Sequence, residues 1–152
     1  MQMFTENLPL ILTVAGIFLS IVMTGVGSAK GANMIGKAAA ALISEQPEKF
    51  GQSLVLQMMS ASQGLYGFII GFLIFFNIGA PIALRDSLRY LTAGLIMGIA
   101  GYITAILQST TATAGIQILA KKPEHSTKGV IYSAMIETYA IFAFVISMMI
   151  VL

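Results

Sequence analysis

Four long apolar segments alternate with short polar stretches along the chain, and this pattern dominates the sequence. We predict transmembrane helices over about residues 8–43, 48–77, 88–120 and 124–152. Each segment has at least the roughly 20 residues that an α-helix needs to cross a bilayer. A membrane β-barrel would show segments of about ten alternating residues instead. The predicted fold class is therefore an all-α, multi-pass protein of the cell membrane.

The polar connections predict how the helices are oriented. Pro47 lies in the first connection, and the second is marked by Gly79, Pro81, Arg85, Asp86 and Arg89. Basic residues are more numerous near the first and third connections, where they are Lys37, Lys49, Lys121, Lys122 and Lys128. Connections rich in basic residues tend to stay on the cytoplasmic side. We therefore expect the first and third connections in the cytoplasm and both termini outside.

The composition excludes several classes of function. Only 9% of the residues are charged and 57% are hydrophobic, whereas soluble domains carry about 25% charged residues. A net charge of +2 without a basic patch argues against nucleic-acid binding. There is no cysteine, and His125 is the only histidine, so the common metal-binding pairs are missing. Without a phosphate-binding loop or a nucleophile–base pair, the chain is not expected to be an enzyme alone. No basic signal region precedes the first apolar segment, which we expect to be retained.

Two parts of the chain resemble each other, which indicates an internal duplication. The sequence Gln46-Pro47-Glu48-Lys49 after the first apolar segment matches Lys122-Pro123-Glu124-His125 after the third. Further along, the region of Gln63 corresponds to the region of Glu137, with a shift of two residues relative to the turns. We predict two helical hairpins in the same orientation, over residues 1–78 and 79–152. Only the second hairpin has the carboxylate.

Small residues recur at a spacing of three and four in the first and third predicted helices. They are Ser20, Thr24, Gly27 and Gly31 in one, and Gly94, Gly98, Gly101, Ala105, Ala112 and Gly115 in the other. Such spacing allows helix backbones to approach closely in a membrane. The pattern fits packing within one four-helix unit, and it also fits a tight inner wall shared by many copies.

Glu137 lies well inside the last predicted span, about nine residues or roughly 13 Å beyond Lys128. An ionisable group at such a depth is costly and usually functional. No lysine or arginine occurs at a comparable depth in the second or fourth span. The carboxyl group should therefore be protonated or paired with an ion that enters from outside.

Oxygen-bearing groups are predicted to lie near this carboxylate. Met59, Ser62, Gln63 and Tyr66 share one face of the second helix, and Ser62 or Gln63 could free the Met59 carbonyl by bending the helix. Gln108 adds an amide from the third helix. One carboxylate among neutral oxygen ligands favours a hard monovalent cation, since a divalent ion would need more carboxylates. Hydrogen bonding between helices, without an ion, is the alternative.

Several stretches together resemble the proteolipid subunit of V-type ATPases, and in particular the bacterial sodium-pumping form with duplicated hairpins. They are the sequences around Gly25–Gly31, Gln63–Phe68, Gly115–His125 and Glu137–Ala140. The resemblance covers nearly the whole chain and implies a homo-oligomeric rotor ring. It also implies a stator membrane subunit that supplies an arginine, and a central-stalk subunit of a soluble ATPase sector.

The resemblance also implies roles for individual residues. Glu137 matches the family's ion-binding glutamate, and Gln63 and Gln108 match the amide ligands of the sodium form. Met59 stands where a backbone carbonyl ligates the ion. The remaining two matches are Ser62, at a position where threonine is usual, and Tyr66, which would steady the glutamate. The implied cargo is Na⁺, with no organic cofactor.

Three other functions remain open from the sequence. A rotor of this kind could carry protons, because a protonated Glu137 is also neutral. A dimeric proton-coupled transporter of small solutes could use the same carboxylate, although such proteins bind cations in aromatic pockets and the chain has no tryptophan. A membrane scaffold would bind no ion at all.

Overall fold

The computed structural model describes the backbone of residues 2–79 and 81–152, and the side chains from Asn7 onward. All of the regular structure in these residues is helical. The α-helices are α1 (Gln2–Phe18), α2 (Thr24–Glu45), α3 (Phe50–Met58), α4 (Ser62–Phe76), α5 (Leu84–Lys121) and α6 (Ser126–Val151). A single π-helical turn, η1 (Leu19–Met23), joins α1 to α2, and two 3₁₀ turns are η2 (Pro47–Lys49) and η3 (Pro123–His125).

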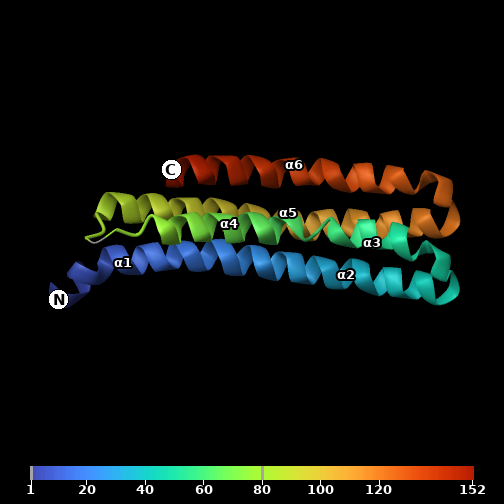
Figure 1. The fold of residues 1–152 in the computed structure, drawn as a ribbon, viewed down its shortest axis with the longest axis horizontal. Helices are drawn as coiled ribbons and strands as arrows, with labels where there is room; N and C mark the ends of the chain where they lie inside the picture. The colour runs from blue at the N-terminus through green and yellow to red at the C-terminus, as the bar shows by residue number, and fades with distance from the viewer. Residues whose placement is uncertain (1, 80) are drawn as a thin grey trace.

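These elements form four long rods that lie side by side (Figure 1). The rods that are long and apolar enough to cross a membrane are Asn7–Glu45, Pro47–Phe76, Leu84–Lys121 and Pro123–Val151. Both termini and the α4–α5 connection lie at one end of the molecule, and η2 and η3 lie at the other end (Figure 1). The four predicted helices and the all-α fold class are thus confirmed.

The start of α5 corrects one prediction. Arg85, Asp86 and Arg89 were expected in the second connection, but α5 already begins at Leu84. Ala83 precedes it in an extended conformation, with φ −72° and ψ 143°. Asp86 and Arg89 are spaced three apart and face each other on the helix surface, with Oδ1 and Nη1 separated by 3.6 Å. Partly exposed charges at a helix end are compatible with a helix that extends beyond the hydrocarbon.

The two 3₁₀ turns have nearly the same geometry, which supports the duplication. Gln46 has φ −138° and ψ 70°, and Lys122 has φ −145° and ψ 74°. Their backbone N–H groups donate to the Leu42 and Ile118 carbonyls, at 2.9 and 2.7 Å. The proline that follows each of them disfavours the helical conformation at the preceding residue, so both helices end at the same point of the motif.

The side chain of Lys49 in η2 contacts the end of α5. Its Nζ donates to the carbonyls of Leu119 and Ala120, at 2.9 and 3.0 Å, and the residue is buried. These carbonyls belong to the last turn of α5, where backbone acceptors lack partners within the helix. Lys49, which the sequence places in the first connection, therefore satisfies the end of α5.

The two-residue shift between the hairpins also has a structural counterpart. The rod of the first hairpin is interrupted between α3 and α4, at Met59–Ala61, whereas α6 in the second hairpin is continuous. Between its turn and its site residue, the first hairpin thus contains the two additional residues and also the interruption. The proposed hairpin boundary after residue 78 falls in the α4–α5 connection and stays a prediction.

The small residues of the first and third rods pack against each other inside one chain. A Cβ atom on Gly98 would lie 2.6 Å from the Leu19 carbonyl oxygen, and one on Gly27 would lie 2.9 Å from the Tyr102 Cα. All of the small residues picked out above are buried, together with Gln108, but Gly115 faces Leu56 and Gly129 and not the first rod. Packing within one chain contributes to their burial, and an inner wall shared by many copies stays a prediction.

A polar layer separates two apolar clusters along the bundle. One cluster, near η2 and η3, includes Ile35, Leu56 and Leu119. The other, near the termini, includes Ile74 and Met97. The buried glutamines Gln63 and Gln108 lie between them, because Gln108 falls between the parts of α5 that contribute to each cluster. This layer contains the candidate site.

Candidate ion-binding site

The site begins at the interruption between α3 and α4. The Met59 and Ala61 N–H groups bond to residues three positions earlier, Leu56 at 3.4 Å and Met58 at 3.0 Å. The tighter bonding ends α3 and begins a new helix at Ser62. The Ser62 hydroxyl donates back to the Met59 carbonyl at 3.3 Å. This is the bend expected from the sequence, produced by a serine that competes within the backbone ladder.

Two helices contribute hydrogen-bond donors to the Glu137 carboxylate on α6. The Tyr66 hydroxyl on α4 donates to Oε1 at 2.8 Å, and the Gln108 Nε2 on α5 approaches Oε2 at 3.4 Å. Tyr66 is held in place by stacking against Phe144, with ring centroids 5.0 Å apart. Glu137 itself is partly buried in the single chain. The carboxylate is thus oriented by partners on both of its oxygens.

The network continues from Gln108 to the interruption. The Gln63 Nε2 donates to the Gln108 Oε1, and the Ser62 hydroxyl lies 3.3 Å from the Gln63 Oε1. Gln63 and Gln108 are completely buried. A chain of polar contacts therefore runs from Tyr66 and Glu137 to the Met59 carbonyl. The structure brings together all six residues picked out from the sequence, at the junction of three helices.

Glu137 has no cationic partner among the described residues. The ion pairs found in residues 7–79 and 81–152 are Asp86–Arg89 and Glu124–His125, and both lie near the helix ends. No group of three or more histidine, cysteine, aspartate or glutamate side chains comes together in those residues either. The site offers one carboxylate with neutral amide, hydroxyl and carbonyl oxygens. Such a donor set provides a single negative charge for a cation.

Three serines that the sequence analysis did not pick out for the site contact the backbone around it. Ser133 on α6 donates to the Gln108 carbonyl at 3.3 Å. Ser20, in the π-helical turn η1, donates to the Gly67 carbonyl at 2.7 Å. Ser28 on α2 accepts the Gly64 N–H at 2.8 Å. Ser20 had been noted only for its size, and a serine that bonds to another helix has no signature of its own in a single sequence.

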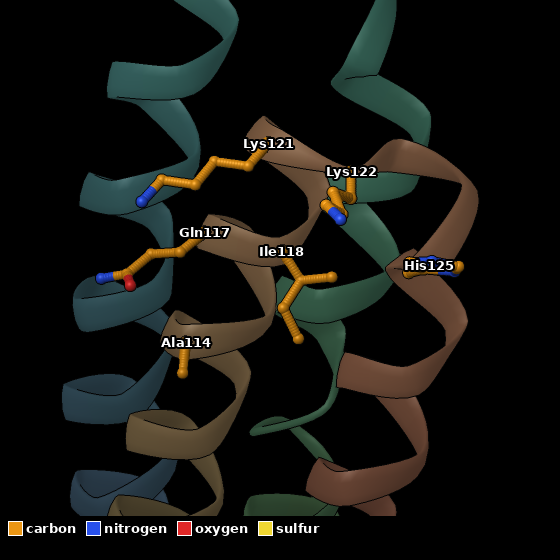
Figure 2. A pocket seen from close by; sticks show the side chains of 6 residues that line it. All are labelled: Ala114, Gln117, Ile118, Lys121, Lys122 and His125. Carbon is orange, nitrogen blue, oxygen red and sulfur yellow. The ribbon is translucent and has the colours of Figure 1, made fainter.

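The cavity drawn in Figure 2 is a different feature, with a volume of about 440 Å³. It lies where α5 ends and η3 begins, and is lined by Ala114, Gln117, Ile118, Lys121, Lys122 and His125. Figure 2 shows Gln117 and Lys121 projecting to the same side of α5, with His125 at the other margin. None of these residues belongs to the Glu137 network.

Comparison with known proteins is consistent with this arrangement. The family described as the ATP synthase C subunit matches the chain twice, over residues 15–74 and 91–150, once in each hairpin. The K subunit of the V-type sodium ATPase of Enterococcus hirae is 51% identical over 150 residues, which cover 99% of this chain and 96% of that protein. The K subunit of the A-type ATP synthase of Methanocaldococcus jannaschii is 36% identical over 143 residues, covering 93% of this chain and 62% of that relative.

Proposed function

The chain belongs to the C-subunit family of ATP synthases, as a rotor proteolipid that is not catalytic by itself, and from this premise we propose that it carries Na⁺ across the membrane at Glu137. The observation that supports the proposal most directly is the carboxylate network. Glu137 is held by Tyr66 and Gln108 and has no cationic side chain beside it in the described residues. A bound monovalent cation would neutralise it. The relative from Enterococcus hirae is named as part of a sodium ATPase.

Binding the ion requires a change at Gln108. Its Nε2 faces Glu137, and its Oε1 accepts from Gln63. A cation needs oxygen ligands, so rotation of this amide by half a turn would direct Oε1 toward the ion. We propose that Gln63 contributes its own Oε1 in the same step. Ser62 and the Met59 carbonyl would add oxygens from the interruption, while Tyr66 continues to hold the other side of the carboxylate.

Transport follows from the charge of the site. With Na⁺ bound the site is neutral, and it can face hydrocarbon as the rotor turns. Without the ion, a carboxylate exposed to hydrocarbon is strongly disfavoured. We propose that Glu137 releases Na⁺ only beside a stator membrane subunit that supplies an arginine and a water-filled half-channel. The driving force would come from ATP hydrolysis in a separate soluble sector.

The assembly we propose is a closed ring of identical chains, attached to a central-stalk subunit. The helices α1, α2 and α5 would line its inside, and α3, α4 and α6 would face outward. The turns η2 and η3 lie at the same end of the bundle (Figure 1). Most of the lysines and arginines lie in or near these turns, so we place the turns in the cytoplasm. An image of the purified oligomer along its axis would count the copies.

Labelling of Glu137 by a hydrophobic carbodiimide tests the ion directly. The purified oligomer is treated with the reagent at several concentrations of Na⁺, of an organic cation, and of choline chloride as a control for ionic strength. Protection by Na⁺ is the expected result. Labelling that responds only to pH would indicate a proton rotor, and protection by an organic cation a small-solute transporter. Labelling unaffected by any of them would indicate a scaffold.

A further inference from the structure

The interruption between α3 and α4 is held by a residue from another helix. The Ser28 hydroxyl on α2 accepts the Gly64 N–H at 2.8 Å, one residue beyond Gln63. We propose that Ser28 is a positioning residue for ion binding, which keeps the second rod interrupted and so holds the Met59 carbonyl and Gln63 in their places. This inference rests on the proposed role of the Glu137 network in Na⁺ binding.

The hydrogen-bond pattern of an uninterrupted helix explains why Ser28 matters. There, the Gly64 N–H would donate to the Ser60 carbonyl, and the Gln63 N–H to the Met59 carbonyl. In the structure, the Gly64 N–H donates to Ser28 and the Met59 carbonyl accepts from the Ser62 hydroxyl. The first N–H groups of a helix lack partners within it. Inside a membrane such a group needs another acceptor, and Ser28 provides it.

The local packing leaves little room for a side chain at position 64. A Cβ atom on Gly64 would lie 3.1 Å from the Ser28 Oγ and 3.3 Å from its Cβ. The same atom would lie 3.9 Å from the Gly25 Cα. A glycine at 64 therefore lets α2 and α4 approach closely enough for the short serine side chain to reach the backbone. The contact therefore depends both on the hydroxyl of Ser28 and on the absence of a side chain at Gly64.

Loss of the Ser28 hydroxyl should shift the balance toward a continuous helix. The Gly64 N–H would then be left without its acceptor in nonpolar surroundings, and forming the regular ladder would satisfy it. That change draws the Met59 carbonyl into the backbone ladder and turns Gln63 relative to Gln108. The carboxylate of Glu137 lies on α6 and keeps its bond to Tyr66, and this change reaches it only through Gln108. Ser28 should thus affect cation binding more than protonation.

The test compares Ser28→Ala with Ser28→Thr and with a matched control on the same helix. Ser44→Ala is the control, because the Ser44 hydroxyl donates to the Ala41 carbonyl of its own helix and is exposed. Apparent Na⁺ affinity is measured on the purified oligomer from Na⁺ protection of Glu137 against the carbodiimide at high pH. The same preparations give the pH dependence of labelling without Na⁺.

We expect Ser28→Ala to weaken Na⁺ binding by about tenfold, the effect of one lost hydrogen bond in a partly buried position. Ser28→Thr keeps the hydroxyl and should bind nearly as well as wild type, as should Ser44→Ala. The pH dependence without Na⁺ should be unchanged in Ser28→Thr and Ser44→Ala and should change less than the Na⁺ affinity in Ser28→Ala. Unaltered Na⁺ affinity in Ser28→Ala would overturn the inference. So would an equal loss in Ser28→Thr or Ser44→Ala, or a change of pH dependence in Ser28→Ala as large as its loss of Na⁺ affinity.

The measurement on the wild-type protein distinguishes a failure of this inference from a failure of the proposed function on which it rests. If wild-type protein shows no protection by Na⁺, the proposed function is wrong and Ser28 has no cation ligands to position. If wild type is protected and Ser28→Ala is protected equally, the function stands and only the role of Ser28 is wrong.

Discussion

Replacing Gln108 with alanine would remove the amide that joins Glu137 to Gln63. In the structure this amide approaches the Glu137 Oε2 at 3.4 Å and accepts a hydrogen bond from Gln63. Its side chain is fully buried. The substitution therefore removes one proposed oxygen ligand of the ion. The loss of that ligand weakens the ion-bound form.

The size of the effect follows from these contacts. A buried polar group that loses its partner costs about 1–3 kcal/mol. Since 1.4 kcal/mol corresponds to a factor of ten in a binding constant, Gln108→Ala should weaken Na⁺ binding by about one to two orders of magnitude. Gln63→Ala should behave alike, because Gln63 is equally buried and bonds to the same amide.

The assay is Na⁺ binding to the purified oligomer at high pH, where protons compete least. Gln117→Ala is the matched control, because Gln117 is an exposed glutamine on the same helix and lines only the cavity of Figure 2. We expect no change in that variant. Wild-type affinity in Gln108→Ala, or an equal loss in Gln117→Ala, would refute the ligand role of Gln108.

Three further outcomes follow from the structure. Glu137→Gln should abolish Na⁺ transport and Na⁺-dependent ATP hydrolysis while the oligomer still forms, because an amide cannot neutralise the cation; transport at the normal rate would contradict this. Wild-type protein should bind Na⁺ more weakly as the pH falls, approaching about tenfold per pH unit where protons occupy Glu137, and a site without Na⁺ binding even at high pH would make the protein a proton rotor. Gly98→Leu should prevent assembly, because its Cβ would lie 2.6 Å from the Leu19 carbonyl oxygen; Ile99→Leu, at an exposed position, should assemble normally, and equal yields of both oligomers would show that this contact is dispensable.

Most of the fold could be predicted from the sequence, because a bilayer allows few structures. Long apolar segments must satisfy their own backbone groups, so they form helices. The two proline-containing turns end α2 and α5 at equivalent positions, because a proline disfavours the helical conformation of the residue before it. The start of α5 was predicted too late because Arg85, Asp86 and Arg89 were assigned to a loop by their charge. A helix that projects beyond the hydrocarbon can carry charges, and hydropathy does not distinguish this from a loop.

The residues of the candidate site could also be predicted from the sequence, but the residues that hold the backbone around it could not all be predicted. Glu137, Gln63 and Gln108 stood out because buried polar groups are rare in membrane helices. Ser20 and Ser28 did not, since serine is common in helices and its partner is a backbone atom on another rod. The same limit applies to Lys49, which the sequence places in the first connection and whose Nζ satisfies the end of α5. Contacts between distant backbones depend on how the rods pack.

The duplication explains how both hairpins contribute to a site with one carboxylate. Each hairpin has a proline-containing turn, but the hairpins differ at the level of the site, where one contributes the amide of Gln63 and the other the carboxyl group of Glu137. A second carboxylate at position 63 would place two negative charges in one dry layer, which a single monovalent ion could not neutralise. The first hairpin instead contributes the interruption at Met59–Ala61, which α6 lacks. If Glu137 is the ion carrier, each chain moves one ion per turn of the rotor, so a ring needs twice as many hairpins as ions.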